Sequence, residues 1–67
     1  MKYIVGDKVK IRKDIKYRTF YGDYPVSEKM LRYRGKIAII KKEVTPFNFY
    51  RIDIDNEMHM WTEEMLE

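Results

Sequence analysis

The side chains best suited to chemistry lie near the C-terminus, where Asp53, Asp55, Glu57 and His59 occupy every second position. Carboxylates and an imidazole at this spacing share one face of a strand and can act as metal ligands or acid–base groups. A calcium loop of the EF-hand type needs glycine at its sixth position, where this chain has Met58. Alternating acids also form the ordinary solvated side of a strand, so we predict no metal site and no cofactor.

Nucleophilic catalysis has little support in the sequence. Ser27 is the only serine, His59 is the only histidine, and cysteine is absent. A catalytic triad would have to bring Ser27 to His59 without the glycine-rich turn that usually presents the nucleophile. The lack of cysteine also excludes a disulfide framework and a thiolate zinc site. We therefore predict that the protein is not an enzyme.

The strongest candidate for binding is the segment 13–34, in which cations alternate with aromatic rings. Such a mixture can hold phosphates and stack on bases, and it is equally typical of protein–protein hot spots. In a purely structural role the rings, Phe20 and Tyr33 above all, would cover the core while the cations extend past it. Trp61 either joins the binding surface or caps the core. The candidate partner-binding residues are Lys13, Lys16, Tyr17, Arg18, Tyr21, Tyr24, Arg32, Arg34 and Trp61.

Charge divides unevenly along the chain. Residues 1–42 carry thirteen Lys and Arg against four acids, a net +9, whereas residues 43–67 carry one Arg against seven acids, a net −6. The two halves together give the formal net charge of +3. If the division survives folding, one face is basic and attracts an acidic partner. Otherwise the halves interleave into a mixed surface with internal ion pairs.

Four or five short strands must position these residues within one small domain, residues 1–67. The alternation over 8–12 turns Val9 and Ile11 inward, and the isoleucine-rich run over 36–44 is strongly strand-like. Residues 13–29 have no sustained period and many turn signals, so a long loop is expected there. Residues 30–35 then lead into the next strand with a bend at the glycine, and the sequence over 45–48 predicts a turn.

The strand over 49–54 and the segment after it predict a hairpin. We expect a three-residue loop over 55–57, because this register puts Met58 and Met60 on the same face as the core residues of the strand. Thr62 followed by two acids predicts a single helical turn, after which the chain folds back onto the core.

Three blocks carry a family resemblance: VGDKVKIR over 5–12, Met30 with YRGK over 33–36, and WTEEM over 61–65. They resemble the Src-homology-three-like barrels and, more narrowly, a family of small uncharacterised proteins encoded by phages and prophages of Gram-positive bacteria. The resemblance implies an all-β fold: a small five-stranded barrel with a long first loop and a C-terminal helical turn. It also implies a viral origin, but no chemistry, since that family has no assigned activity.

We predict a non-enzymatic accessory binding module that binds and modulates a host or phage protein, as a counter-defence inhibitor would. One alternative is a nucleic-acid-binding module that uses the basic N-terminal half, and another is a structural protein that self-associates. Src-homology-three domains that bind proline-rich peptides carry an acidic first loop, so the basic loop here argues against that ligand.

Membrane and export signals are weak. The longest apolar run, residues 37–40, is far too short to span a bilayer. The N-terminus does not resemble a signal peptide, because charge returns at Asp7. We therefore expect a cytoplasmic location, in the bacterial host if the protein is phage-encoded, and no membrane partner.

Overall fold

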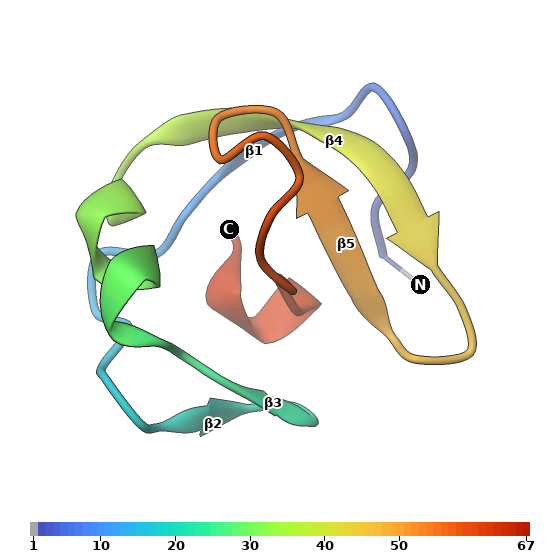
Figure 1. Cartoon of the computed structure of the whole chain (residues 1–67). Coiled ribbons are helices and arrows are strands. Elements are labelled where there is room, and N and C mark those ends of the chain that lie inside the picture. The colour runs from blue at the N-terminus through green and yellow to red at the C-terminus, as the bar shows by residue number, and fades with distance from the viewer. Residues whose placement is uncertain (1) are drawn as a thin grey trace.

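The computed structural model describes residues 2–67 as mainly β structure in two antiparallel sheets (Figure 1). One sheet has three strands in the order β1-β4-β5, and the other pairs β2 with β3. The strands are β1 (Lys8–Lys10), β2 (Phe20–Tyr21), β3 (Tyr24–Pro25), β4 (Ile37–Val44) and β5 (Phe49–Ile52). Two short 3-10 helices complete the fold, η1 (Glu28–Tyr33) and η2 (Glu63–Met65).

The three-stranded sheet confirms the alternation seen in the sequence. Val9 pairs with Ala38 across β1 and β4, and both side chains are buried together with Ile11. On the other side of β4, Ile40 pairs with Ile52, and a bulge follows before Lys42. The turn between β4 and β5 lies at 45–48 as predicted.

The C-terminal segment bridges β1 and β5, the two outer strands of this sheet, on the side away from β4. Tyr50 of β5 exchanges backbone hydrogen bonds with Trp61, at 2.7 and 3.1 Å. On the other side, Lys10 and Glu67 exchange a second pair, at 3.0 and 2.8 Å. Figure 1 shows η2 in the middle of the curve that the other elements describe. The segment thus satisfies backbone groups that β1 and β5 would otherwise expose at their edges.

The predicted closed five-stranded barrel is not seen within residues 2–67. Strands β2 and β3 pair only with each other, and the C-terminal segment contributes isolated bridges instead of a continuous strand. The helical turn η2 interrupts this segment, because Met65 donates its N–H to the Thr62 carbonyl at 3.0 Å. The predicted turn after Thr62 is confirmed, and Met65 and Leu66 are buried behind it.

Residues 30–35 lead into β4 with a bend at Gly35 as predicted, but the approach to that bend is the 3-10 helix η1, which the sequence did not indicate. Helix η1 begins after Ser27, whose N–H donates to Met30 Sδ at 3.3 Å. The helical turn carries Met30 into the core, where 3 % of its surface remains exposed. Gly35 bends the chain into β4 with a φ of 76°, a value that favours glycine.

The core is one cluster beneath both sheets. Trp61 and Tyr50 are its largest fully buried members. Tyr21, Tyr24, Leu31 and Tyr33 pack against it from the residues of the long first loop and η1. The cluster comprises Val9, Ile11, Ile15, Val26, Met30, Ala38, Ile40, Tyr50, Ile52, Trp61, Met65 and Leu66.

Replacement of Tyr50 by phenylalanine is expected to lower the free energy of unfolding by about 1 kcal/mol at pH 7. The Tyr50 hydroxyl accepts a hydrogen bond from the Tyr3 N–H at 2.9 Å, and phenylalanine leaves that donor unpaired. Burial raises the pKa of Tyr50, because the phenolate is poorly solvated there. The unfolded chain therefore releases this proton first, and stability falls as the pH rises from about 10 towards the raised pKa.

Urea unfolding at pH 7 and in a series above pH 9 measures both effects. The Tyr50→Phe variant should lose less stability than the parent protein on the alkaline side. Tyr17→Phe is the matched control, because the Tyr17 ring is exposed. An identical alkaline decline in parent and Tyr50→Phe would contradict the prediction.

Candidate functional site

The structure distributes the predicted binding residues over several places. The segment before β2 holds Lys16, Tyr17 and Arg18. The β2–β3 hairpin holds Tyr21 and Tyr24, whereas Arg32 lies in η1 and Arg34 directly after it. Trp61 is far from all of these in sequence and is fully buried. Trp61 therefore cannot share an exposed surface with the other predicted residues.

Tyr21 and Tyr24 turn towards the core. Tyr21 accepts a hydrogen bond from the Lys16 N–H at 3.0 Å, which holds the start of the hairpin. The Tyr24 ring meets the Phe49 ring edge to face, with centroids 5.4 Å apart. These rings are half-buried and packed on neighbouring groups, so they do not present free faces for stacking on bases.

Tyr17 and Arg18 are the exposed part of the loop. The Arg18 guanidinium carbon lies 5.2 Å from the centroid of the Tyr17 ring, within the range of a cation–π contact. Arg18 has a φ of 64°, and its N–H donates to the Val26 carbonyl at 3.0 Å. The backbone of the hairpin base thus fixes where this pair projects into solvent.

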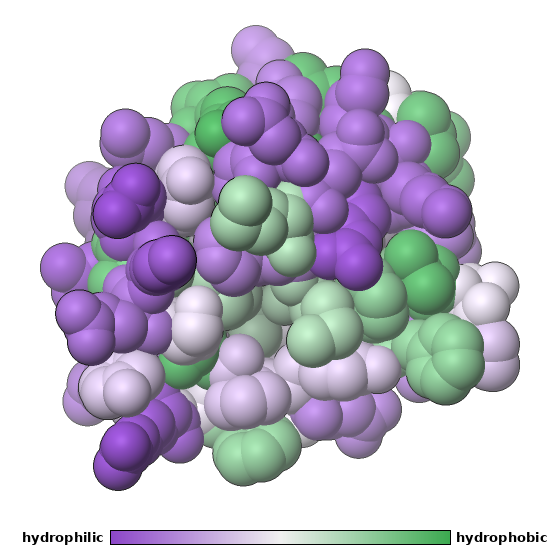
Figure 2. Space-filling model, in the orientation of Figure 1, coloured by the Kyte–Doolittle hydropathy of each residue, from purple (hydrophilic) through white to green (hydrophobic). Residues whose placement is uncertain are grey.

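A second basic group surrounds the C-terminal end of η1. Arg32 and Arg34 are exposed, and Arg34 Nε donates to the Leu31 carbonyl at 3.0 Å. The stem of Lys13 lies against Gly35, where an added Cβ would be 3.2 Å from Lys13 Cγ. Figure 2 shows hydrophilic residues gathered along the edge that η1 occupies in Figure 1.

An acid weakens the positive potential close to this group. Arg12 donates to Asp14 through Nε and Nη2, at 3.0 and 2.9 Å. This hydrogen bond lowers the pKa of Asp14, so the carboxylate stays ionised at neutral pH. The two residues flank Lys13, and Asp14 neutralises Arg12, one of the cations of the basic N-terminal half.

Trp61 belongs to the core, as the capping alternative requires, and it offers no exposed binding surface. Its indole Nε1 donates to Asp55 Oδ2 at 3.0 Å. The same oxygen accepts the His59 N–H at 3.0 Å and lies 2.9 Å from His59 Nδ1. Asp55 and His59 thus form a hydrogen-bonded network around the indole.

The predicted hairpin register after β5 is wrong. Tyr50 pairs with Trp61, whereas the predicted register would have paired Ile52 with Met60. Asn56 and Glu57 both adopt left-handed backbone, with φ of 56° and 60°. The turn they form shifts the following residues by one position, which brings the tryptophan into the core and turns the methionines outward.

This shift creates an apolar groove. Met58 and Met60 are 66 % and 40 % exposed, and they flank a hollow of about 240 Å³. Phe20, which is 66 % exposed, pairs across the β2–β3 hairpin with Pro25, and Pro25 lines this hollow. We call this hollow the methionine groove; its lining residues are Pro25, Ser27, Met30, Met58, His59 and Met60.

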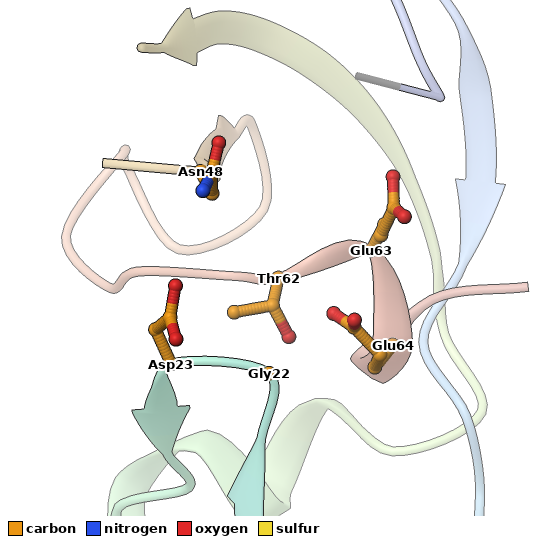
Figure 3. Close-up of a pocket in the computed structure, with 6 residues that line it drawn as sticks. All are labelled: Gly22, Asp23, Asn48, Thr62, Glu63 and Glu64. Atoms are coloured by element: carbon orange, nitrogen blue, oxygen red, sulfur yellow. The ribbon is translucent and has the colours of Figure 1, made fainter. Parts of the chain in front are cut away.

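A second hollow, of about 360 Å³, lies where three segments that are distant in sequence meet. The β2–β3 turn contributes Gly22 and Asp23, the β4–β5 turn contributes Asn48, and the start of η2 contributes the rest (Figure 3). We call it the acidic pocket; its lining residues are Gly22, Asp23, Asn48, Thr62, Glu63 and Glu64. In the sequence, Thr62 and the two acids after it indicated only the start of a helical turn.

Comparison of the chain with protein-family models, with curated proteins and with solved structures found no match. Among residues 2–67, no three His, Cys, Asp or Glu side chains are grouped closely enough to hold a metal ion. Neither of the two short helices in this part of the chain has the length and apolar character needed to cross a membrane.

Proposed function

We propose that the protein is a non-catalytic binding module that attaches to a protein partner through the methionine groove. The partner contributes an apolar side chain, from a short linear segment, to the hollow between β3 and the loop after β5. The observation that carries this proposal is the exposure of Met58 and Met60 beside a hollow of about 240 Å³.

Methionines exposed in this way are suited to binding. The thioether side chain is flexible and polarizable, so it adapts to apolar groups of different shape. Phe20 extends the apolar surface along the hairpin, and Met30 provides a buried floor. An apolar surface of this kind, bordered by polar residues, is typical of an interaction site in a small soluble domain.

A protein partner is favoured over nucleic acid by the placement of the aromatic rings. Single-stranded nucleic acid is held by rings that stack on bases within a basic groove. Here Tyr21 and Tyr24 pack towards the core, and Tyr17 is already covered by Arg18 on one side. The remaining exposed cations attract phosphates, but without a continuous stacking surface they support weak and salt-sensitive binding.

The likeness to the phage-encoded family stays a prediction, as do the viral origin, a host or phage protein as partner, and counter-defence activity. The curved sheet bridged by the C-terminal segment supports a Src-homology-three-like architecture in an open form. The absence of enzymatic activity also stays a prediction. Self-association stays an alternative, and light scattering over a concentration series tests it.

Selection from a library of random peptides tests the proposal. We expect wild-type protein to enrich peptides with a bulky apolar side chain. Met58→Glu and Met60→Glu should each bind the selected peptides at least about tenfold more weakly, because a buried charge would replace an apolar contact. Fluorescence anisotropy of a labelled peptide gives the dissociation constants.

Phe47→Glu is the matched control for these variants. Phe47 is 60 % exposed but lies in the β4–β5 turn, outside the methionine groove. The Phe47→Glu variant should therefore bind the selected peptides with the same affinity as the parent protein. Equal affinities for Met58→Glu, Met60→Glu and the parent protein would refute the groove as the binding site. A salt titration with single- and double-stranded DNA and RNA tests the alternative, which requires tight binding that falls steeply with salt.

A further inference from the structure

Two carboxylates in the acidic pocket have no cationic partner among residues 2–67. The ion pair in this part of the chain is Arg12–Asp14, and Asp55 is engaged by His59 and Trp61, so Asp23 and Glu64 stand free in a protein of net charge +3. Glu63 is engaged differently, because its Oε2 accepts the Lys2 backbone N–H at 3.1 Å. In Figure 3 the Glu64 carboxylate lies near Gly22, and the Glu63 carboxylate points in another direction.

Thr62 supplies an independent observation. The residue is 1 % exposed, and its hydroxyl oxygen has no hydrogen-bond partner. Thr62 occupies the N-cap of η2, yet the hydroxyl makes none of the capping bonds usual at that position. Figure 3 shows the hydroxyl directed into the space between Gly22 and the Glu64 carboxylate. A buried hydroxyl without a partner is unfavourable, and a donor that entered this space would satisfy it.

We propose that the acidic pocket binds the positively charged end of a lysine or arginine side chain from another molecule. The cation would lie between Asp23 and Glu64, with the Thr62 hydroxyl as a further acceptor. Ammonium and guanidinium groups carry several N–H donors and no acceptor, which matches a pocket lined by oxygen acceptors. The Glu64 side chain is exposed and Thr62 lines the same hollow, so both can face an entering cation.

The geometry favours an organic cation over a metal ion. No three acidic or histidine side chains within residues 2–67 are close enough together to coordinate a metal. The volume of about 360 Å³ accommodates a charged group together with part of its methylene stem. The pocket shares no residue with the methionine groove, so this proposal does not depend on the proposed function.

Nuclear magnetic resonance titration tests the proposal with small probes. N-acetyl-lysinamide and N-acetyl-argininamide are added separately to ¹⁵N-labelled protein at low salt. We expect saturable shifts of the Gly22, Thr62 and Glu64 amides with at least one probe, and the comparison separates ammonium from guanidinium recognition. N-acetyl-norleucinamide, which has the stem without the charge, should give no saturable shift at these amides.

Two variants connect the shifts to the pocket. Glu64→Gln should weaken binding by about tenfold, because a charge-assisted hydrogen bond is lost. Thr62→Val should also weaken it, while its unfolding temperature stays equal to or above that of the parent, since the hydroxyl has no partner in the free protein. Glu57→Gln removes an exposed acid outside the pocket and should bind as the parent does.

Three results would overturn the proposal. The first is the absence of saturable shifts with both cationic probes, and the second is an equal response to the norleucine probe. The third is unchanged affinity in both Glu64→Gln and Thr62→Val. Saturable shifts of the same amides with Mg²⁺, and none with either organic cation, would assign the pocket to a metal instead.

Discussion

Replacement of Asp55 by alanine is expected to lower the free energy of unfolding by about 3–5 kcal/mol. Asp55 is buried, and its Oδ2 accepts hydrogen bonds from the His59 backbone and the Trp61 indole, with His59 Nδ1 at 2.9 Å. Alanine would leave these donors without an acceptor. A domain of this length is stable by only about 3–10 kcal/mol, so the loss is a large share of the total and should shift the urea midpoint far below that of the parent protein.

The fluorescence of Trp61, the single tryptophan of the chain, reports this unfolding directly in a urea titration. Asp55→Asn serves as an intermediate test, because its amide oxygen can still accept hydrogen bonds while the charge is gone. The free energy of unfolding of Asp55→Asn should lie between the values for the parent protein and for Asp55→Ala. Glu57→Ala, an exposed acid in the same turn, should change stability by no more than about 0.5 kcal/mol. A parent-like urea midpoint for Asp55→Ala would show that the network contributes little.

The regular parts of the fold follow from local sequence patterns. Alternation placed Val9 and Ile11 in the core, and the structure confirms both. The turn at 45–48 was predictable because asparagine tolerates left-handed backbone, and Asn48 has a φ of 61°. The helical turn after Thr62 was predictable from its capping residue. In each case the deciding interaction lies within a few residues along the chain.

The hairpin after β5 could not be predicted in the same way. Hydrophobic patterning counts Met58, Met60 and Trp61 alike as apolar residues, and the predicted register buries the larger number of them. The structure buries the single large ring instead, because its indole N–H finds a buried acceptor in Asp55. Asn56 and Glu57 make this register accessible by both adopting positive φ.

The candidate sites were harder to predict than the strands. Charges and rings in the first loop were visible in the sequence, but which rings face inward depends on packing against β5 and η1. The acidic pocket joins the turn at 22–23, Asn48 and the start of η2, which no spacing rule brings together. Asp23 belongs to the basic half of the chain, so the linear division of charge did not indicate this acidic surface either.

Replacement of Trp61 by alanine is expected to cost about 3–5 kcal/mol of unfolding free energy. The indole is fully buried, and the Tyr33 ring meets it edge to face at 6.1 Å. Alanine would leave a large cavity and deprive Asp55 of a hydrogen-bond donor. Trp61→Phe should cost less, because it keeps most of the ring volume and loses the indole N–H.

Calorimetry and one-dimensional proton spectra measure these two variants, since neither retains a tryptophan. Phe47→Ala is the control, because Phe47 is exposed and should change stability by about 0.5 kcal/mol or less. Because Trp61 and Asp55 share a hydrogen bond, Asp55→Ala combined with Trp61→Phe should cost less than the sum of the single changes. Strict additivity would mean that Asp55 stabilises the turn through His59 alone, and a parent-like unfolding temperature for Trp61→Ala would contradict its place in the core.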